Sequence, residues 1–143
     1  MKKKIYLASS MNGDCRNQYH LAKMILENAD FDVYYPAEHV IEHAWDYPNH
    51  EWGLMVFQND IEAIRTCDYL VLLSYGRNST AGANWEAGYA FGIGKKVIVV
   101  EMTDEVMSLM VANGRYATVK GLVGLKQYDW ENMPKTRTET EQK

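Results

Sequence analysis

Residues 69–73 read Tyr69-Leu70-Val71-Leu72-Leu73, an unbroken apolar run. A short run without polar alternation indicates a strand that is buried on both faces, which is typical of parallel sheets. A polar loop follows, and Gly82-Ala83-Asn84-Trp85-Glu86-Ala87-Gly88-Tyr89-Ala90 then opens a helix. The pattern predicts a strand–loop–helix unit of an open α/β sheet. Such sheets bind ligands in a crevice beyond the carboxyl ends of their strands, and we expect Glu86 to face that crevice.

Strand and helix signals alternate along the rest of the chain. Further strands are predicted at Lys4–Ala8, Asp32–Tyr35, Val97–Glu101 and Tyr116–Val119. Helices are predicted from about Asp14 to Asn28, from the Pro48 break to Thr66, from the Glu86 segment to Gly92 and Gly94, and over Glu105–Val111; Leu122–Trp130 stays unassigned. The second helix has an apolar stripe of Trp52, Val56, Ile61 and Ile64. This alternation predicts right-handed crossovers and a flavodoxin-like parallel five-stranded sheet with helices on both faces.

Length and composition limit the domain organisation. With 143 residues, 47% of them hydrophobic, the chain is long enough for one domain with a core but short for two. We therefore expect a single domain over residues 1–133. The segment Pro134–Lys143 is polar and nearly free of apolar residues, which predicts a disordered tail.

Charge and cysteine content exclude several classes of partner. The net charge is −4, and Lys2-Lys3-Lys4 is the longest run of like charge, which argues against binding to a nucleic acid polymer. The sequence contains no apolar segment of the roughly 20 residues that a membrane span needs. Cys15 and Cys67 form neither a CxxC pair nor a disulfide framework, and no secretory signal precedes the first strand. We expect a cytoplasmic protein.

Familiar cofactor and catalytic motifs are absent. No GxGxxG follows the first strand, and Gly94-Lys95-Lys96 lacks the remaining residues of a P-loop. Ser9 and Ser10 have no GxSxG elbow. His39 and His43 would chelate a metal only on a helix, but Pro36 and Pro48 make that segment a predicted loop. We therefore expect no cofactor and no metal.

The remaining candidate for chemistry is the Glu86 carboxylate. Near a helix N-terminus its ionised form is favoured, so it can act as a nucleophile or base. We expect the Glu86 carboxylate to be surrounded by residues that lie in or after strands or face the same crevice. These residues are Tyr6, Ser10, Asn12, Gly13, Trp52, Asp60, Thr80 and Gly82. This set suits substitution at the anomeric carbon of a sugar, while Trp45, Trp52 or Phe57 could stack on a nucleobase. Each residue also has a structural alternative: dipole complementation for Glu86, solvent exposure for Asp60, and packing for Tyr6 and Trp52.

Four segments carry a resemblance to a known family: Ile5-Tyr6-Leu7-Ala8, Trp52 with Asn59-Asp60, Trp85-Glu86-Ala87-Gly88-Tyr89-Ala90, and Ser108-Leu109-Met110. Over about Ile5–Gly114 the chain resembles the nucleoside 2-deoxyribosyltransferases and the related 2′-deoxynucleoside 5′-monophosphate N-glycosidases. The resemblance implies that Glu86 attacks C1′ of the deoxyribose, while Tyr6 and Asp60 hold the sugar and the carboxylate. It also implies a homo-oligomer in which Ser108 and Met110 complete a neighbour's pocket, with deoxynucleosides or deoxynucleotides and free bases as the small-molecule partners.

Two departures from the transferase pattern keep a second branch open. Many transferases have an Asp six residues before the nucleophile and an Asn before the Leu-Met pair, where this chain has Thr80 and Ser108. These hydroxyls and Ser10 are similar to the phosphate-binding positions of the monophosphate N-glycosidases, but Asn12 replaces the arginine of that branch, and Arg16 and Arg77 are the possible substitutes. Transfer of deoxyribose to a base is the first hypothesis, hydrolysis of a deoxynucleotide the alternative, and a non-catalytic nucleotide sensor the alternative of another class.

Overall fold

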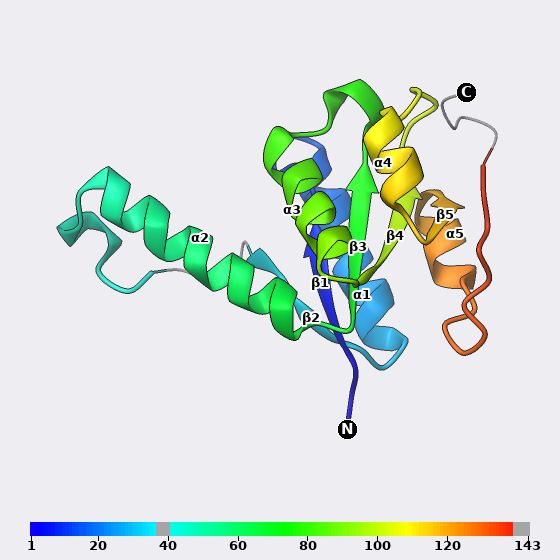
Figure 1. Ribbon diagram of the computed structural model, residues 1–143, viewed down its shortest axis with the longest axis horizontal. Helices are drawn as coiled ribbons and strands as arrows, with labels where there is room; N and C mark the ends of the chain where they lie inside the picture. The colour runs from blue at the N-terminus through cyan, green and yellow to red at the C-terminus, as the bar shows by residue number, and fades with distance from the viewer. Residues whose placement is uncertain (37–40, 139–143) are drawn as a thin grey trace.

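One parallel sheet forms the centre of the molecule (Figure 1). The computed structural model describes residues 1–36 and 41–138, and in these residues the sheet has five strands. They are β1 (Lys4–Ala8), β2 (Asp32–Tyr34), β3 (Tyr69–Ser74), β4 (Lys96–Glu101) and β5 (Ala117–Lys120), in the order β2-β1-β3-β4-β5. All four pairings are parallel, which confirms the predicted flavodoxin-like sheet. The strand order reverses between β1 and β3, where open sheets bind ligands.

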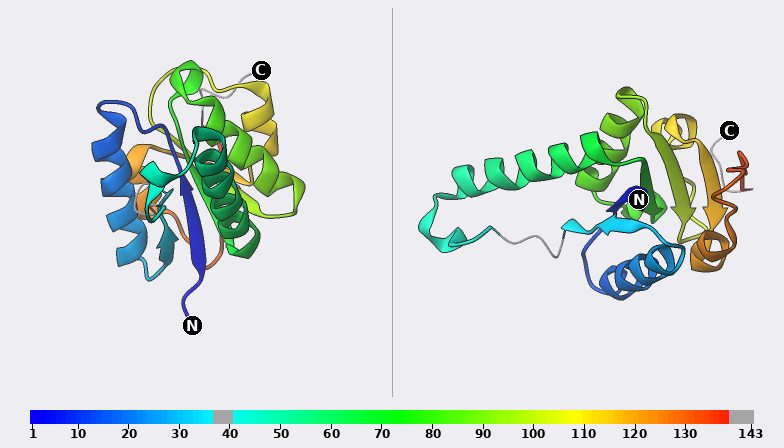
Figure 2. Two further views of the ribbon diagram at one scale, coloured as in Figure 1. Left: turned by 90° about the vertical axis from the view of Figure 1, so that its left-hand side faces the viewer. Right: turned by 90° about the horizontal axis from the view of Figure 1, so that it is seen from below.

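Helices cover both faces of this sheet (Figure 2). On one face, α1 (Cys15–Asn28) and α5 (Gly121–Gln127) pack over the alternate strand residues Ile5, Val71 and Ile98. On the other face, α2 (Asn49–Thr66), α3 (Ala81–Gly92) and α4 (Leu109–Gly114) pack over Tyr6, Leu72 and Val99. Short 3-10 turns, η2 (Ala44–Asp46) and η3 (Gly76–Asn78), lie in the connections. The alternation of side chains along each strand therefore separates two apolar cores.

The helix α3 begins and ends as its sequence predicts. Thr80 precedes it, and the Thr80 hydroxyl accepts a hydrogen bond from the backbone N–H of Ala83. Gly94 follows it with a φ of +86°, a conformation that favours glycine at a helix end. This helix packs on the sheet through Ala83, Ala87 and Ala90 and carries Glu86 beside Tyr6 of β1.

The helix α2 is much less buried than its apolar stripe predicts. Of the stripe residues, Ile64 is buried, whereas 44% of Trp52 is exposed. Figure 1 shows the reason: the amino-terminal part of α2 extends well beyond the sheet, so only its last turns lie against the other elements. In the described residues none of the helices combines the length and apolar character that crossing a bilayer requires.

The C-terminal third departs from the predicted boundaries. The helix predicted over Glu105–Val111 begins only at Leu109, because the Ser108 hydroxyl accepts the Val111 N–H at 3.2 Å and caps α4. The predicted fifth strand is shifted by one residue. The unassigned segment contains α5, whose Leu125 is buried against the sheet.

Residues 134–138, the first part of the predicted tail, make specific contacts with the sheet. The Thr118 N–H donates to the Thr136 carbonyl at 2.9 Å, and the Thr136 hydroxyl donates to the Thr118 carbonyl at 2.8 Å. The Thr138 hydroxyl donates to the buried Glu101 carboxylate at 2.5 Å. These backbone and side-chain bonds replace the apolar contacts that the tail lacks. Residues 139–143 lie outside the described residues.

Candidate active site

A cavity of about 490 Å³ lies on the sheet face covered by α2 and α3, at the carboxyl end of β1. Both carboxylates singled out from the sequence, Asp60 on α2 and Glu86 on α3, line it. Thr80 and Gly82 at the start of α3 line it as well, as does Ser9 after β1. The rest of the wall is mainly apolar and aromatic and includes Tyr19, Phe57 and Trp85. The volume is in the range of small-molecule sites.

Glu86 is held by a hydrogen bond from the interior strand β1. Tyr6 is fully buried, and its hydroxyl donates a hydrogen bond to Glu86 Oε2. Burial and then the negative charge of Glu86 raise the pKa of Tyr6, so the phenol keeps its proton and remains a donor. The bond fixes one carboxylate oxygen and leaves the other available to the cavity.

The expected ionisation of Glu86 by the helix dipole is wrong. Glu86 is the sixth residue of α3, beyond the first turn in which the dipole acts. Burial raises the pKa of Glu86 to about 7, the nearby charge of Asp60 acts in the same direction, and the bond from Tyr6 opposes both. Glu86 is therefore partly protonated near neutral pH, a state typical of functional carboxylates.

Asp60 is positioned by a residue that the sequence did not indicate. Its Oδ1 accepts a hydrogen bond from the Tyr34 hydroxyl at 3.1 Å. Tyr34 lies on β2, directly beside Tyr6 in the parallel register. A single tyrosine in a short edge strand gives no sequence signal for such a role. Its place beside Tyr6 depends on which strands pair and in which register.

Several residues predicted to bind substrate lie away from this cavity. Ser10 is buried, and its hydroxyl accepts the Asn12 N–H at 3.4 Å within the loop after β1. Asn12 and Gly13 are exposed in the same loop, and Gly13 has a positive φ of +48°. Trp52 lies on the amino-terminal part of α2 that extends beyond the sheet, here called the α2 arm, and Trp45 lies in the turn η2 before it. Neither lines the cavity, and Trp45 is fully exposed.

Ser108 and Met110 line a different cavity. It has about 320 Å³ and lies between α3 and α4. Neither residue is in the lining of the Glu86 cavity, so within one chain these two residues are not brought to Glu86, and Met110 is 84% exposed.

Tyr19 on α1 also lines the Glu86 cavity, and its hydroxyl donates to the Leu7 carbonyl at 2.7 Å.

The charge of the lining restricts the ligands that fit. No lysine or arginine is among the residues that line the Glu86 cavity in the described part of the chain. The same part contains no cluster of three or more histidine, cysteine or acidic side chains that could hold a metal ion. His39 lies outside the described residues. Two carboxylates, a buried phenol and aromatic walls suit a ligand that is polar at one end and flat and apolar at the other.

The raised pKa of Glu86 predicts a pH-dependent cost to stability. Between its ordinary value of 4.5 and about 7 the folded protein binds more protons than the unfolded chain, so stability falls as pH rises through this window. Glu86→Gln removes the charge. We expect it to raise the free energy of unfolding by about 1–3 kcal/mol at pH 8, with no gain at pH 4. Urea unfolding at both pH values measures this.

A matched control for this prediction is Glu131→Gln, which removes a carboxylate that is exposed in the structure. It should leave the free energy of unfolding within about 0.5 kcal/mol at both pH values. A Glu86→Gln protein that is less stable than the parent at pH 8 would contradict the burial of the charge.

Comparison with known proteins agrees with the fold. The family model described as nucleoside 2-deoxyribosyltransferase matches residues 5–132. A 2-deoxyribosyltransferase from Bacillus psychrosaccharolyticus is 26% identical, with a TM-score of 0.80 over 94% of this chain and 98% of that chain. Two solved structures share the fold at lower identity. A conserved protein from Enterococcus faecalis V583 is 20% identical, with a TM-score of 0.61 over 98% of this chain and 93% of that one. A CMP N-glycosidase from Clostridium botulinum is 18% identical, with a TM-score of 0.60 over 87% and 96%.

Among curated proteins none matches the chain. The family match nevertheless spans almost the whole described sequence, and the parallel sheet with helices on both faces is the fold that the sequence predicts. The chain therefore belongs to the nucleoside 2-deoxyribosyltransferase family, whose members are enzymes that act on the N-glycosidic bond.

Proposed function

We propose that this enzyme cleaves the N-glycosidic bond of 2′-deoxyribonucleosides through Glu86 and transfers the deoxyribose to an acceptor base. The observation that carries the proposal is the Tyr6–Glu86 hydrogen bond beside Asp60 in one cavity. A carboxylate that is fixed through one oxygen presents the other in a defined direction, which is what attack on a carbon centre requires.

The reaction has two steps. In the first, a Glu86 oxygen forms a bond to C1′, and the C1′–N bond breaks with its electron pair leaving on the base. Positive charge develops at C1′, so the nearby Asp60 carboxylate stabilises the transition state. In the second, a nitrogen of the acceptor base attacks C1′ and the ester bond breaks, which restores the Glu86 carboxylate. The departing base gains one proton and the acceptor loses one, so the exchange balances. A 2′-hydroxyl would withdraw electrons from C1′, which favours deoxyribose.

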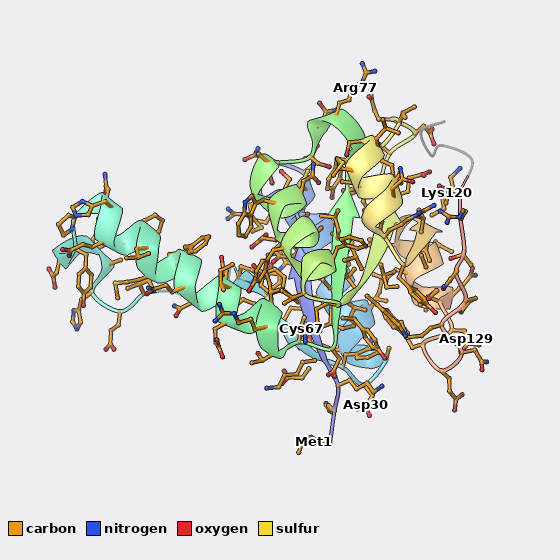
Figure 3. All side chains as sticks on the ribbon, in the orientation of Figure 1. Met1, Asp30, Cys67, Arg77, Lys120 and Asp129 are labelled. Atoms are coloured by element: carbon orange, nitrogen blue, oxygen red, sulfur yellow. The ribbon has the colours of Figure 1, made fainter. Side chains whose placement is uncertain are left out.

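A neutral nucleoside fits the cavity better than a nucleotide. A 5′-phosphate dianion would enter a site with two carboxylates and, in the described lining, no cation. Arg77 points outward from the turn after β3 (Figure 3) and faces a shallow hollow with Asp104 and Glu105. Arg16 is exposed on α1. Neither arginine supplies the charge that a phosphate needs.

Hydrolysis of a 2′-deoxynucleoside 5′-monophosphate is the second candidate. The observation in its favour is the Thr80 hydroxyl, which lines the cavity. As a hydroxyl it can donate to a phosphate oxygen while it accepts the Ala83 N–H. Ser108 makes the same kind of cap on α4 at a distance from this cavity.

Two aromatic rings at the cavity supply a surface for the base. Phe57 on α2 and Trp85 on α3 both line it, with ring centroids 5.6 Å apart. Both are about half exposed, 49% and 52%, although they are among the largest apolar side chains. Stacking of a planar base on either ring would bury this surface. We assign this role to Phe57 and Trp85 rather than to Trp45 or Trp52.

The enzyme is proposed to work as an oligomer with shared pockets. Leu109 and Met110 on α4 are 53% and 84% exposed, and Trp52 and Leu54 on the α2 arm are 44% and 54% exposed. Apolar surface of this extent on two separate elements is typical of an interface between subunits. Because Ser108 and Met110 do not reach Glu86 within one chain, the proposal places them at the pocket of a neighbouring subunit.

Product analysis tests the reaction. With deoxyadenosine and cytosine as substrates we expect deoxycytidine and adenine as products, measured by chromatography. The rate should fall at least about 10³-fold in Glu86→Ala, because no other group can form the ester. The exposed Glu131→Ala control should keep full rate. Base release only from monophosphates would establish the second candidate. Binding without either product would establish a sensor and overturn both.

The pH profile tests the role of Glu86 as an anion. With a deoxynucleoside whose base does not titrate between pH 5 and 8, kcat/KM should rise with pH and level off above about 7, because the free enzyme must hold Glu86 ionised to attack. Steady-state rates at constant ionic strength measure it. A kcat/KM that falls over this range would instead make Glu86 a general acid.

Subunit mixing tests the shared pocket. Glu86→Ala chains and chains with both Ser108→Ala and Met110→Ala should each be impaired alone. Mixed oligomers should regain activity, because one of their pockets combines an intact Glu86 with an intact Ser108 and Met110. Val123→Ala, on the exposed side of α5, is the matched control and should stay active alone. A protein that sediments as a monomer under assay conditions and is fully active would contradict the proposal.

A further inference from the structure

Tyr34 on the edge strand β2 contacts two residues of the site, Tyr6 and Asp60. It is the register partner of Tyr6 on the neighbouring parallel strand, so both side chains project from the same face of the sheet. Their rings are stacked, with centroids 5.2 Å apart and an interplanar angle of 17°. The next residue, Tyr35, points to the opposite face and belongs to the other core. Tyr34 is thus the side chain through which β2 reaches the cavity.

The Tyr34 hydroxyl donates to Asp60 Oδ1 at 3.1 Å. Burial, followed by the charge of Asp60, raises the pKa of Tyr34, so the phenol stays protonated and continues to donate across the working pH range. One side chain therefore touches the Tyr6 ring, which supports Glu86, and the Asp60 carboxylate itself.

This bond adds a specific polar contact with the sheet to a helix that has one buried side chain. Ile64 is the buried residue of that helix, and the helix extends away from the sheet in its first half (Figure 1). The Arg65 side chain donates to the Tyr89 hydroxyl at 3.0 Å, but this contact with α3 is at the exposed surface. A charge-assisted hydrogen bond from the sheet to Asp60 holds the carboxylate at the cavity rather than in solvent.

We propose that Tyr34 is a positioning residue that sets the place of Asp60 relative to Glu86. The inference rests on the proposed function for its effect on turnover, but its structural part does not. Without the donor, the Asp60 carboxylate loses the hydrogen bond that ties it to β2, and a partly buried charge with fewer hydrogen bonds gains hydration by shifting toward water. The site then loses the negative charge that faces the developing positive charge at C1′.

Tyr34→Phe tests the proposal because it keeps the ring and its stacking and removes only the hydroxyl. We expect kcat to fall about 10- to 100-fold, because the Asp60 charge no longer faces C1′, and the melting temperature to change little, because the carboxylate regains hydration. In an Asp60→Asn background the same change should have almost no further effect, since Tyr34 acts through the Asp60 charge. Tyr69→Phe is the matched control, because its hydroxyl contacts Lys3 at the amino end of the sheet; it should keep full activity.

A second readout needs no substrate. Carbon-13 NMR of the side-chain carboxyls in the free protein gives the titration of Glu86, whose pKa is raised in part by Asp60. In Tyr34→Phe the midpoint should move toward that of an ordinary glutamate, as in Asp60→Asn, and it should not move in Tyr69→Phe. An unchanged midpoint, or additive losses in the double variant, would overturn the positioning role. If the parent protein has no glycosidic activity while the midpoint still moves, the proposed function fails and the positioning of Asp60 survives.

Discussion

The hydrogen bond from Tyr6 to Glu86 joins an interior strand of the sheet, β1, to the helix that carries the candidate nucleophile. Tyr6 is fully buried, and its strand is paired on both sides, so this donor has very little freedom to move. Glu86 is therefore placed by the register of the sheet rather than by a loop. The position of a carboxylate relative to a sugar carbon has to be correct to a fraction of an ångström. A strand that is paired on both sides, as β1 is, is the most rigid support that this fold offers.

The same burial carries an energetic cost. A carboxylate with a pKa of about 7 is only half ionised at neutral pH, and folding disfavours its charge. The cost has a chemical counterpart, because an anion with few water contacts is more basic and has less solvent to shed before it attacks carbon. The phenol of Tyr6 limits the cost, since it donates to the anion and lowers a pKa that burial and Asp60 raise. The site thus balances a reactive anion against a stable fold, a compromise typical of functional sites.

The parts of the structure that sequence predicted are those that depend on local patterns. The apolar run at 69–73 gives β3, the Glu86 segment gives α3, and the alternation of strands and helices gives the parallel sheet. Long-range facts were out of reach. The role of Tyr34 depends on strand register, the ionisation of Glu86 depends on its burial, and the exposure of Trp52 depends on how far α2 extends past the sheet. The order at Thr136 likewise comes from pairing with a strand that is remote in sequence.

Two structural elements of different rigidity face each other across the cavity: β1 with α3, and the less buried helix α2. The proposed reaction uses this difference. Tyr6 and Glu86 belong to β1 and α3, the more rigid side, which acts on C1′ in both steps. Asp60 and Phe57 belong to α2, which contributes one buried side chain to the core. In base exchange the sugar stays attached while one base leaves and another enters, so the wall that contacts the base has to accept different rings. A helix anchored mainly at its C-terminal end can do so, provided that a specific contact keeps its carboxylate in place. The Tyr34–Asp60 hydrogen bond is the contact in the right position, which makes the shortest strand of the sheet a determinant of the site.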